Sequence, residues 1–146
     1  MRLNLTLLFS LFISITLNAQ IRKIPAEVTD AFRARYPHAE KVEWRDELSS
    51  FEAQFLLNNY EMSANFNSKG EWLHSERKMK YEELPASVKD GFSKSKYTEW
   101  EKVSAYEINK SMEPIKYRIL VKKSGVQKKY LYFDTEGKLN RESLTL

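Results

Sequence analysis

Histidine and cysteine are the side chains most often used for metal binding and nucleophilic chemistry, and this chain is poor in both. It has no cysteine, which excludes a thiolate metal site, a cysteine nucleophile and any disulfide bond. Its two histidines, His38 and His74, are too few for a three-histidine site and do not form a His-x-x-x-His pair. His74 and Glu76 would share one strand face and could hold a metal weakly, but an ordinary exposed strand face explains them better. We therefore predict no metal site.

The carboxylates do not indicate an enzyme either. Asp46-Glu47 and Glu82-Glu83 are expected in loops, whereas general acid–base catalysis needs a carboxyl group shielded from water. Asp134-Thr135-Glu136-Gly137 resembles the start of a calcium loop, but the later ligands are missing and a hairpin turn explains it. The sequence contains neither a Gly-x-Ser-x-Gly nucleophile motif nor a glycine-rich phosphate-binding motif. We predict a non-enzymatic protein without a cofactor.

The amino terminus is typical of a secretory signal peptide. The positive start Met1-Arg2 precedes an apolar run from Leu3 to Leu17, and Ala19 offers a small residue for cleavage. The run is shorter than the roughly 20 residues of a membrane-spanning helix, so no stable membrane anchor is expected after cleavage. We predict a signal peptide at residues 1–19 and one mature domain at residues 20–146, secreted to the periplasm. The sequence leaves the oligomeric state of this domain open.

Length and charge limit the classes of partner. A chain of 146 residues suits a single folded domain. It carries 24 Lys and Arg against 20 Asp and Glu, and loss of Arg2 with the signal peptide reduces the net charge from +4 to +3. This small excess is not gathered into a polybasic run, so a nucleic-acid partner is not expected for a secreted protein.

The chain repeats itself. The segment from Ile24 to Phe32 matches that from Leu84 to Phe92 at an offset of 60, with Pro, Ala, Val, Asp and Phe at equivalent positions. Two shorter matches follow in the same order, which indicates an internal duplication with repeat one at about residues 21–81 and repeat two at about residues 82–146. The shorter matches pair Glu40-Lys41-Val42 with Glu101-Lys102-Val103, and Phe66 and Gly70 with Phe133 and Gly137.

Each repeat is predicted to be a helix followed by four antiparallel strands. Pro25 and Pro85 suit the first turn of a helix, and Pro37 ends the first helix. Apolar and polar residues then alternate, which indicates a sheet with one covered face and one solvated face. The fold predicted is α+β, two tandem repeats of a helix plus a four-stranded antiparallel sheet, and the sequence leaves open whether the strands form one sheet or two. Strands are expected near residues 41–45, 51–58, 60–66, 71–79, 102–108, 115–123, 127–134 and 138–144, with turns that include Asn58-Asn59 and Ser124-Gly125.

These patterns resemble the PepSY-like family, whose members are small secreted bacterial proteins similar to the β-lactamase-inhibitor protein. The resemblance rests on Ile-Pro-x-x-Val-x-x-x-Phe from Ile24, on Tyr36-Pro37-x-Ala39-x-x-Val42-x-Trp44, and on Phe-x-x-x-Gly before each closing strand. Repeat two departs from it, with Lys96-Tyr97 in place of Tyr36-Pro37 and Ala105 in place of Trp44. The resemblance implies tandem helix-plus-sheet units and a role in binding or inhibiting another protein, and it supplies no site residues.

The solvated face of repeat two is predicted to be aromatic and basic. The repeat aligns Leu131 and Phe133 with core positions, so alternation directs Tyr130 and Tyr132 to the opposite face. Tyrosine and arginine are preferred in the hot spots of protein interfaces. The candidate protein-binding face consists of Tyr106, Arg118, Leu120, Tyr130 and Tyr132; the matching face of repeat one is polar and acidic, with Glu52, Gln54, Glu61, Ser63 and Asn65.

These tyrosines could also serve the fold and not a partner. Tyrosine favours strands and pairs well across them, so an exposed tyrosine can stabilise the sheet alone. The face could instead pack on repeat one or on a second molecule. The sequence leaves both of these roles open beside recognition of a partner.

We expect a secreted, non-enzymatic binding module that acts on another secreted or periplasmic protein, with inhibition or regulation through the aromatic and basic face as the leading hypothesis. The alternative is a protein that binds a small molecule or a cell-envelope ligand, between helix and sheet or between the repeats. A cavity of roughly a few hundred Å³ with converging polar groups would favour the small ligand. A flat or concave aromatic face would favour the protein partner.

Overall fold

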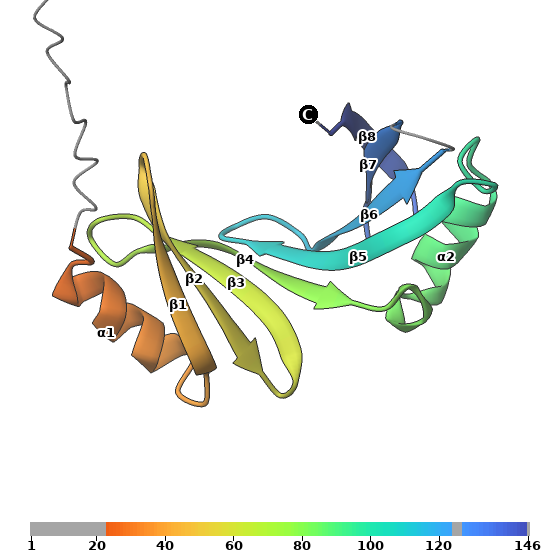
Figure 1. Ribbon diagram of the computed structural model, residues 1–146. Coiled ribbons are helices and arrows are strands. Elements are labelled where there is room, and N and C mark those ends of the chain that lie inside the picture. Colours follow the sequence, from red (N-terminus) through yellow and green to blue (C-terminus); the bar gives the residue numbers. More distant parts are fainter. Residues whose placement is uncertain (1–22, 124–126, 146) are drawn as a thin grey trace, which may run out of the picture.

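The structure, a computed structural model, describes residues 23–123 and 127–145 (Figure 1). The predicted signal peptide at residues 1–19 and the predicted Ser124-Gly125 turn lie outside these residues. Within them, no helix has the length and apolar character needed to cross a membrane. The elements in chain order are α1 (Ala26–Arg35), β1 (Glu40–Glu47), β2 (Ser50–Leu57), β3 (Tyr60–Phe66), β4 (Trp72–Met79), the short 3-10 helix η1 (Tyr81–Glu83), α2 (Ala86–Ser93), β5 (Glu101–Lys110), β6 (Lys116–Lys122), β7 (Lys128–Phe133) and β8 (Leu139–Leu144).

The eight strands form one antiparallel sheet in which each strand pairs with the next, in the order β1 to β8. The α+β class is confirmed, and the choice between one sheet and two is settled by the pairing of β4 with β5. In that pairing Glu76 lies opposite Ile108, and Met79 lies opposite Ala105. The strands that precede η1 and those that follow α2 therefore share one continuous hydrogen-bonded ladder.

The two helices pack at opposite ends of the sheet (Figure 1). The core under α1 contains Val28 and Phe32 from the helix and apolar residues of β2 and β3. Phe32 is its centre, with its ring 5.0 Å from the ring of Phe55 and 5.3 Å from that of Trp44, both edge-on. The alternation predicted for β2 is confirmed, because Phe51, Ala53 and Phe55 are buried.

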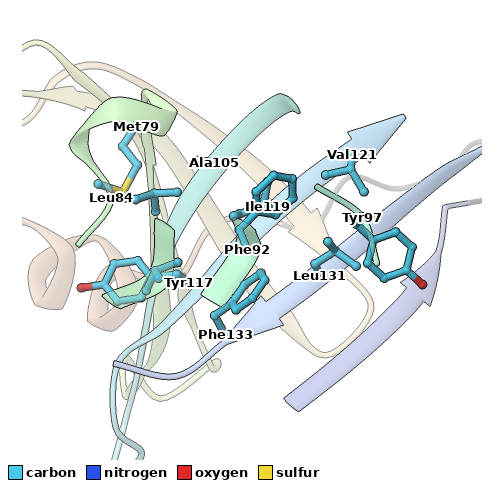
Figure 2. Close-up of a cluster of buried hydrophobic side chains, with 11 residues drawn as sticks. Met79, Leu84, Phe92, Tyr97, Ala105, Tyr117, Ile119, Val121, Leu131 and Phe133 are labelled. Carbon is cyan, nitrogen blue, oxygen red and sulfur yellow. The ribbon is translucent and has the colours of Figure 1, made fainter. Parts of the chain in front are cut away.

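The second core lies under α2 (Figure 2). Val88 and Phe92 enter it from the helix, which has only eight residues and gains its stability from this burial. The sheet contributes residues of β4 to β7. The buried members are Met79, Leu84, Val88, Phe92, Tyr97, Ala105, Tyr117, Ile119, Val121, Leu131 and Phe133.

Polar residues of β4 and β5 separate the two cores. Arg77 lies opposite Met62 on one side and Glu107 on the other, and Glu107 lies opposite Tyr117. Arg77 Nη2 and Glu107 Oε2 are 2.9 Å apart. One row of paired residues on the helix-covered face therefore connects the first core with the second, through the ion pair of Arg77 and Glu107. Both helices accordingly lie on the same side of the sheet. We call the other side, which no described helix covers, the open face.

Glycine turns hold each helix against the sheet. Gly70, between β3 and β4, has φ +80°, and a Cβ there would lie 2.5 Å from the carbonyl oxygen of Glu27 in α1. Gly137, between β7 and β8, has φ +85°, and a Cβ there would lie 2.0 Å from the carbonyl oxygen of Ser87 in α2. Only glycine allows both the positive φ and this close approach of turn to helix.

The segment that follows α2 is tied to the last strand. Tyr97 is only 2% exposed, its ring stands edge-on to that of Trp100, and its hydroxyl donates a hydrogen bond to Glu142 on β8. Lys96 and Lys129 also pair with Glu142, at 2.9 and 3.0 Å. The hydrogen bonds from Tyr97, Lys96 and Lys129 lower the pKa of Glu142 to about 2. Tyr97, at which the predicted second repeat departs from the family pattern, is therefore a core residue with its own anchor.

Candidate functional site

The five residues of the predicted binding face lie side by side on the open face. Tyr106 pairs with Arg118 and Arg118 with Tyr132, across β5, β6 and β7. Leu120 pairs with Tyr130 in the neighbouring row. All five are partly buried although no described helix covers them, because their side chains pack against one another. The prediction that these five side chains lie together on the face opposite the core is confirmed.

Arg118 is at the centre of this group. Its guanidinium carbon lies 4.6 Å from the ring centre of Tyr106 and 5.0 Å from that of Tyr130. Glu76 on β4 accepts two hydrogen bonds from Arg118, of 2.9 and 2.5 Å. Burial acts to lower the pKa of Arg118, but attraction and hydrogen bonds to Glu76, with smaller contributions from Tyr132, together raise that pKa. A guanidinium held in one orientation loses less conformational freedom when a partner binds.

The polar half of the open face lies on β2 and β3. Gln54 donates a hydrogen bond of 2.8 Å to Glu52 on the same strand. β4 connects this half to the aromatic half, because Lys78 on β4 forms an ion pair of 2.6 Å with Glu61. The predicted contrast between the two halves is confirmed by the pairing of β2 with β3, which aligns Glu52 with Asn65, Gln54 with Ser63 and Leu56 with Glu61.

Over the described residues, the open face is hollowed by a larger and a smaller depression. The larger, of about 580 Å³, lies over β1 to β6 and is lined by residues of the polar half together with Tyr106. The smaller, of about 320 Å³, lies over β4 to β8 and is lined in part by Tyr132 and Arg141. Glu76 and Arg118 line both depressions, so their ion pair stands where the two meet. The open face is therefore concave across its middle strands.

His74 belongs to the smaller depression and lies on the same face as Glu76, as the alternation predicts. Its Nε2 is 3.2 Å from the side-chain nitrogen of Asn65, and burial lowers the pKa of the imidazole. Glu76 is engaged by Arg118. Among residues 23–123 and 127–145, no three metal-ligating side chains lie together. The histidine is a hydrogen-bonded part of the floor of this depression.

The carboxylate pairs are placed differently from the prediction. Asp46 and Glu47 were expected in a loop, which is wrong, because β1 continues through both of them in register with β2. Glu83 lies in η1 and accepts hydrogen bonds from the backbone N–H of Lys80 and from the hydroxyl of Tyr60. These two bonds lower the pKa of Glu83, whereas a general acid at neutral pH needs a raised pKa.

Sequence patterns do not identify two residues of the site. They indicate Glu76 only as a weak metal ligand and give no role to Arg141, whose guanidinium carbon lies 4.3 Å from the ring centre of Tyr132. Alternation along β4 and β8 was the available signal. It could not be used for Glu76 without knowledge that β4 and β5 pair.

Comparison with known proteins supports the fold. Residues 49–141 match the family described as "Putative beta-lactamase-inhibitor-like, PepSY-like". No curated protein matches the chain. Three solved Bacteroides structures share the fold, each aligned over 84% of this chain.

The first of these structures is described as "putative periplasmic proteins" from Bacteroides eggerthii, with 21% identity, 90% of that chain covered and a TM-score of 0.80. The second is a DUF2874 family protein from Bacteroides ovatus, with 22% identity, 89% covered and a TM-score of 0.80. The third is a BLIP-like protein from Bacteroides fragilis, with 24% identity, 88% covered and a TM-score of 0.78. At these identities the likeness establishes the fold alone.

Proposed function

Because the chain belongs to the beta-lactamase-inhibitor-like, PepSY-like family, we propose that it is a non-enzymatic binding module that docks its open face onto another protein and restrains that protein. The family description and the BLIP-like name of one structural relative support an inhibitor-like role. The mechanism is occlusion: a rigid sheet covers part of the partner's surface. The proposal leaves the target open.

One observation carries this proposal: Arg118, held by Glu76 and flanked by two tyrosine rings, lies at the centre of an uncovered concave face. Binding energy in protein interfaces concentrates in a few central Tyr, Trp and Arg side chains. Fixing such side chains before binding reduces the entropy lost on association. The aromatic rings and Arg118 are the anchors, and the polar residues on β2 and β3 form one rim.

The alternative, a small molecule or cell-envelope ligand, is less well supported by the depressions. Small-molecule pockets are mostly apolar and enclose the ligand. The larger depression is lined by four glutamates, two lysines and Arg118, and no described helix closes it. An open, charged hollow suits a protruding segment of a protein better than a small apolar ligand.

We also propose that the two halves arose by duplication, as tandem repeats at about residues 21–81 and 82–146. The order of a helix followed by four strands occurs twice. The support is strongest at the equivalent glycines Gly70 and Gly137, which share a positive φ and the same contact of turn with helix. The unequal charges of the two halves then reflect divergence of one ancestral open face.

The proposed location is the periplasm, after removal of residues 1–19 as a signal peptide. The amino-terminal sequence pattern supports it. The description of one structural relative as periplasmic supports it as well.

The proposal predicts that Tyr130→Ala/Tyr132→Ala abolishes capture of a specific partner. The mature protein, immobilised, is incubated with secreted and periplasmic proteins of the source organism, and bound proteins are identified by mass spectrometry. A protein retained by the wild type and lost from the double variant supports the open face as the docking surface, because each truncation removes a central aromatic contact.

Arg33→Ala is the matched control, because Arg33 lies on α1 with its side chain 75% exposed, on the other side of the sheet. It should retain the partner. A partner lost from Arg33→Ala but kept by the tyrosine variant would contradict the proposal, and so would retention of the same proteins by all three. Unchanged thermal melts of both variants establish that the fold is intact.

A further inference from the structure

The smaller depression of the open face has a chemistry of its own, which follows from its charge. Four cationic side chains line it, Lys110, Lys116, Arg118 and Arg141, against the single carboxylate of Glu76. That carboxylate is already engaged by Arg118. The lining therefore carries a positive excess on a protein whose total charge is only slightly positive. A local excess of this kind attracts an anionic group and steers its approach.

Arg141 is the uncompensated cation of this group. Its guanidinium stacks on Tyr132, and among the described residues no carboxylate lies within ion-pair distance of it. Stacking on the ring leaves the guanidinium edge, which carries the N–H donors, directed to solvent or to a ligand. Arg141 can thus form a bidentate pair with an incoming carboxylate without first breaking an internal ion pair.

The lysines at the other end already bind a carboxylate. Glu113, in the turn between β5 and β6, lies 2.9 Å from Lys116 and 3.9 Å from Lys110. Its side chain is 44% exposed, so an incoming carboxylate can replace it or join it. The chain itself shows that a carboxylate fits this end of the depression.

The spacing of the cations favours an extended ligand over a single small anion. Lys116 on β6 and Arg141 on β8 are two strand spacings apart, about 10 Å across the sheet. Arg141 is level with Arg118, so the two cations are also offset by two residues, about 7 Å, along the strands. One phosphate or carboxylate group spans only a fraction of that distance. An extended peptide rises about 3.3 Å per residue, so carboxylates four residues apart, about 13 Å, reach from one cation to the other.

We infer that the smaller depression binds an acidic segment of the protein partner, through carboxylates paired with Arg141 at one end and Lys116 at the other. This inference rests on the proposed function and adds the chemistry of the partner. Ile108 is buried in the floor and Tyr132 forms a wall, so the segment lies on a partly apolar surface. Both cations are exposed at the surface, so each charge pair adds only a modest attraction and the two act together.

A labelled hexapeptide of alternating Ser and Glu, and its Ser and Gln counterpart, provide the test by fluorescence anisotropy at low salt. The acidic peptide should bind the wild-type protein and the Gln peptide should not. Arg141→Gln/Lys116→Gln should weaken binding at least tenfold, since two charge-assisted contacts are lost. Lys128→Gln, an exposed cation on the same face that does not line the depression, should change binding less than twofold.

Three results would overturn the inference. Binding of the Gln peptide with equal affinity would show that charge is not recognised. An equal loss in Lys128→Gln would show diffuse attraction without a site. Inorganic phosphate that binds as tightly as the peptide, and displaces it, would assign the depression to a free anion. None of these results alters the partner-capture experiment, so failure of the acidic-segment inference and failure of the docking proposal are distinguishable.

Discussion

Phe92→Ala is expected to reduce the free energy of unfolding by about 3–5 kcal/mol. Phe92 is 1% exposed, and its ring lies 5.6 Å from that of Tyr81 within the second core. Its removal leaves a cavity under α2, a helix too short to persist without the sheet. Because the same strands carry Arg118 and the tyrosines on their other face, loosening this core also loosens the open face.

Urea unfolding followed by circular dichroism measures this change. Ser93→Ala is the control, because Ser93 lies next to Phe92 but its hydroxyl bonds only to the backbone of its own helix in an exposed position. Its effect should stay within about 0.5 kcal/mol. A loss below about 1 kcal/mol for Phe92→Ala would mean that α2 is not docked as described.

Gly137→Ala is expected to destabilise the protein by about 2–5 kcal/mol, the combined cost of a left-handed backbone for alanine and of overpacking. At φ +85°, the added Cβ would lie 2.0 Å from the carbonyl oxygen of Ser87, which is backbone and cannot rotate away. Ser87 also donates a hydrogen bond of 2.7 Å to the carbonyl of Thr135 in the same turn. The turn and α2 therefore have to separate to admit one methyl group.

The same urea experiment measures the Gly137 variant, with Lys138→Ala as the neighbouring exposed control. The control should unfold within about 0.5 kcal/mol of the wild type. Equal stability of Gly137→Ala and wild type would refute the contact between turn and helix. It would also remove the strongest support for equivalence of Gly70 and Gly137.

Most of the helices and strands could be predicted from local patterns in the sequence, for a physical reason. A period of two in strands and a proline at each helix start are properties of a few neighbouring residues. They place Tyr130 and Tyr132 on the open face without knowledge of the rest of the chain. The prediction of a loop at Asp46 and Glu47 is wrong, because pairing with β2 extends β1 through them although aspartate and glutamate are depleted in strands.

Pairings over a long sequence distance were beyond local patterns. The contact of Glu76 with Arg118 spans 42 residues and depends on β4 lying beside β5, which the sequence left open. Arg141 became part of the site only when β8 was placed next to β7. The proposed duplication relates positions of the two halves to each other, but it does not identify the edge at which the halves join.

The most direct test of the open face as docking surface is site-specific photo-crosslinking. A photo-crosslinking amino acid replaces Leu120 on the aromatic half of the open face, and in a second variant it replaces Asp90, which is exposed on α2 on the opposite side. The account predicts a covalent adduct with the captured partner from position 120 and none from position 90. An adduct from position 90 and none from position 120 would place the partner on the helices and contradict the account.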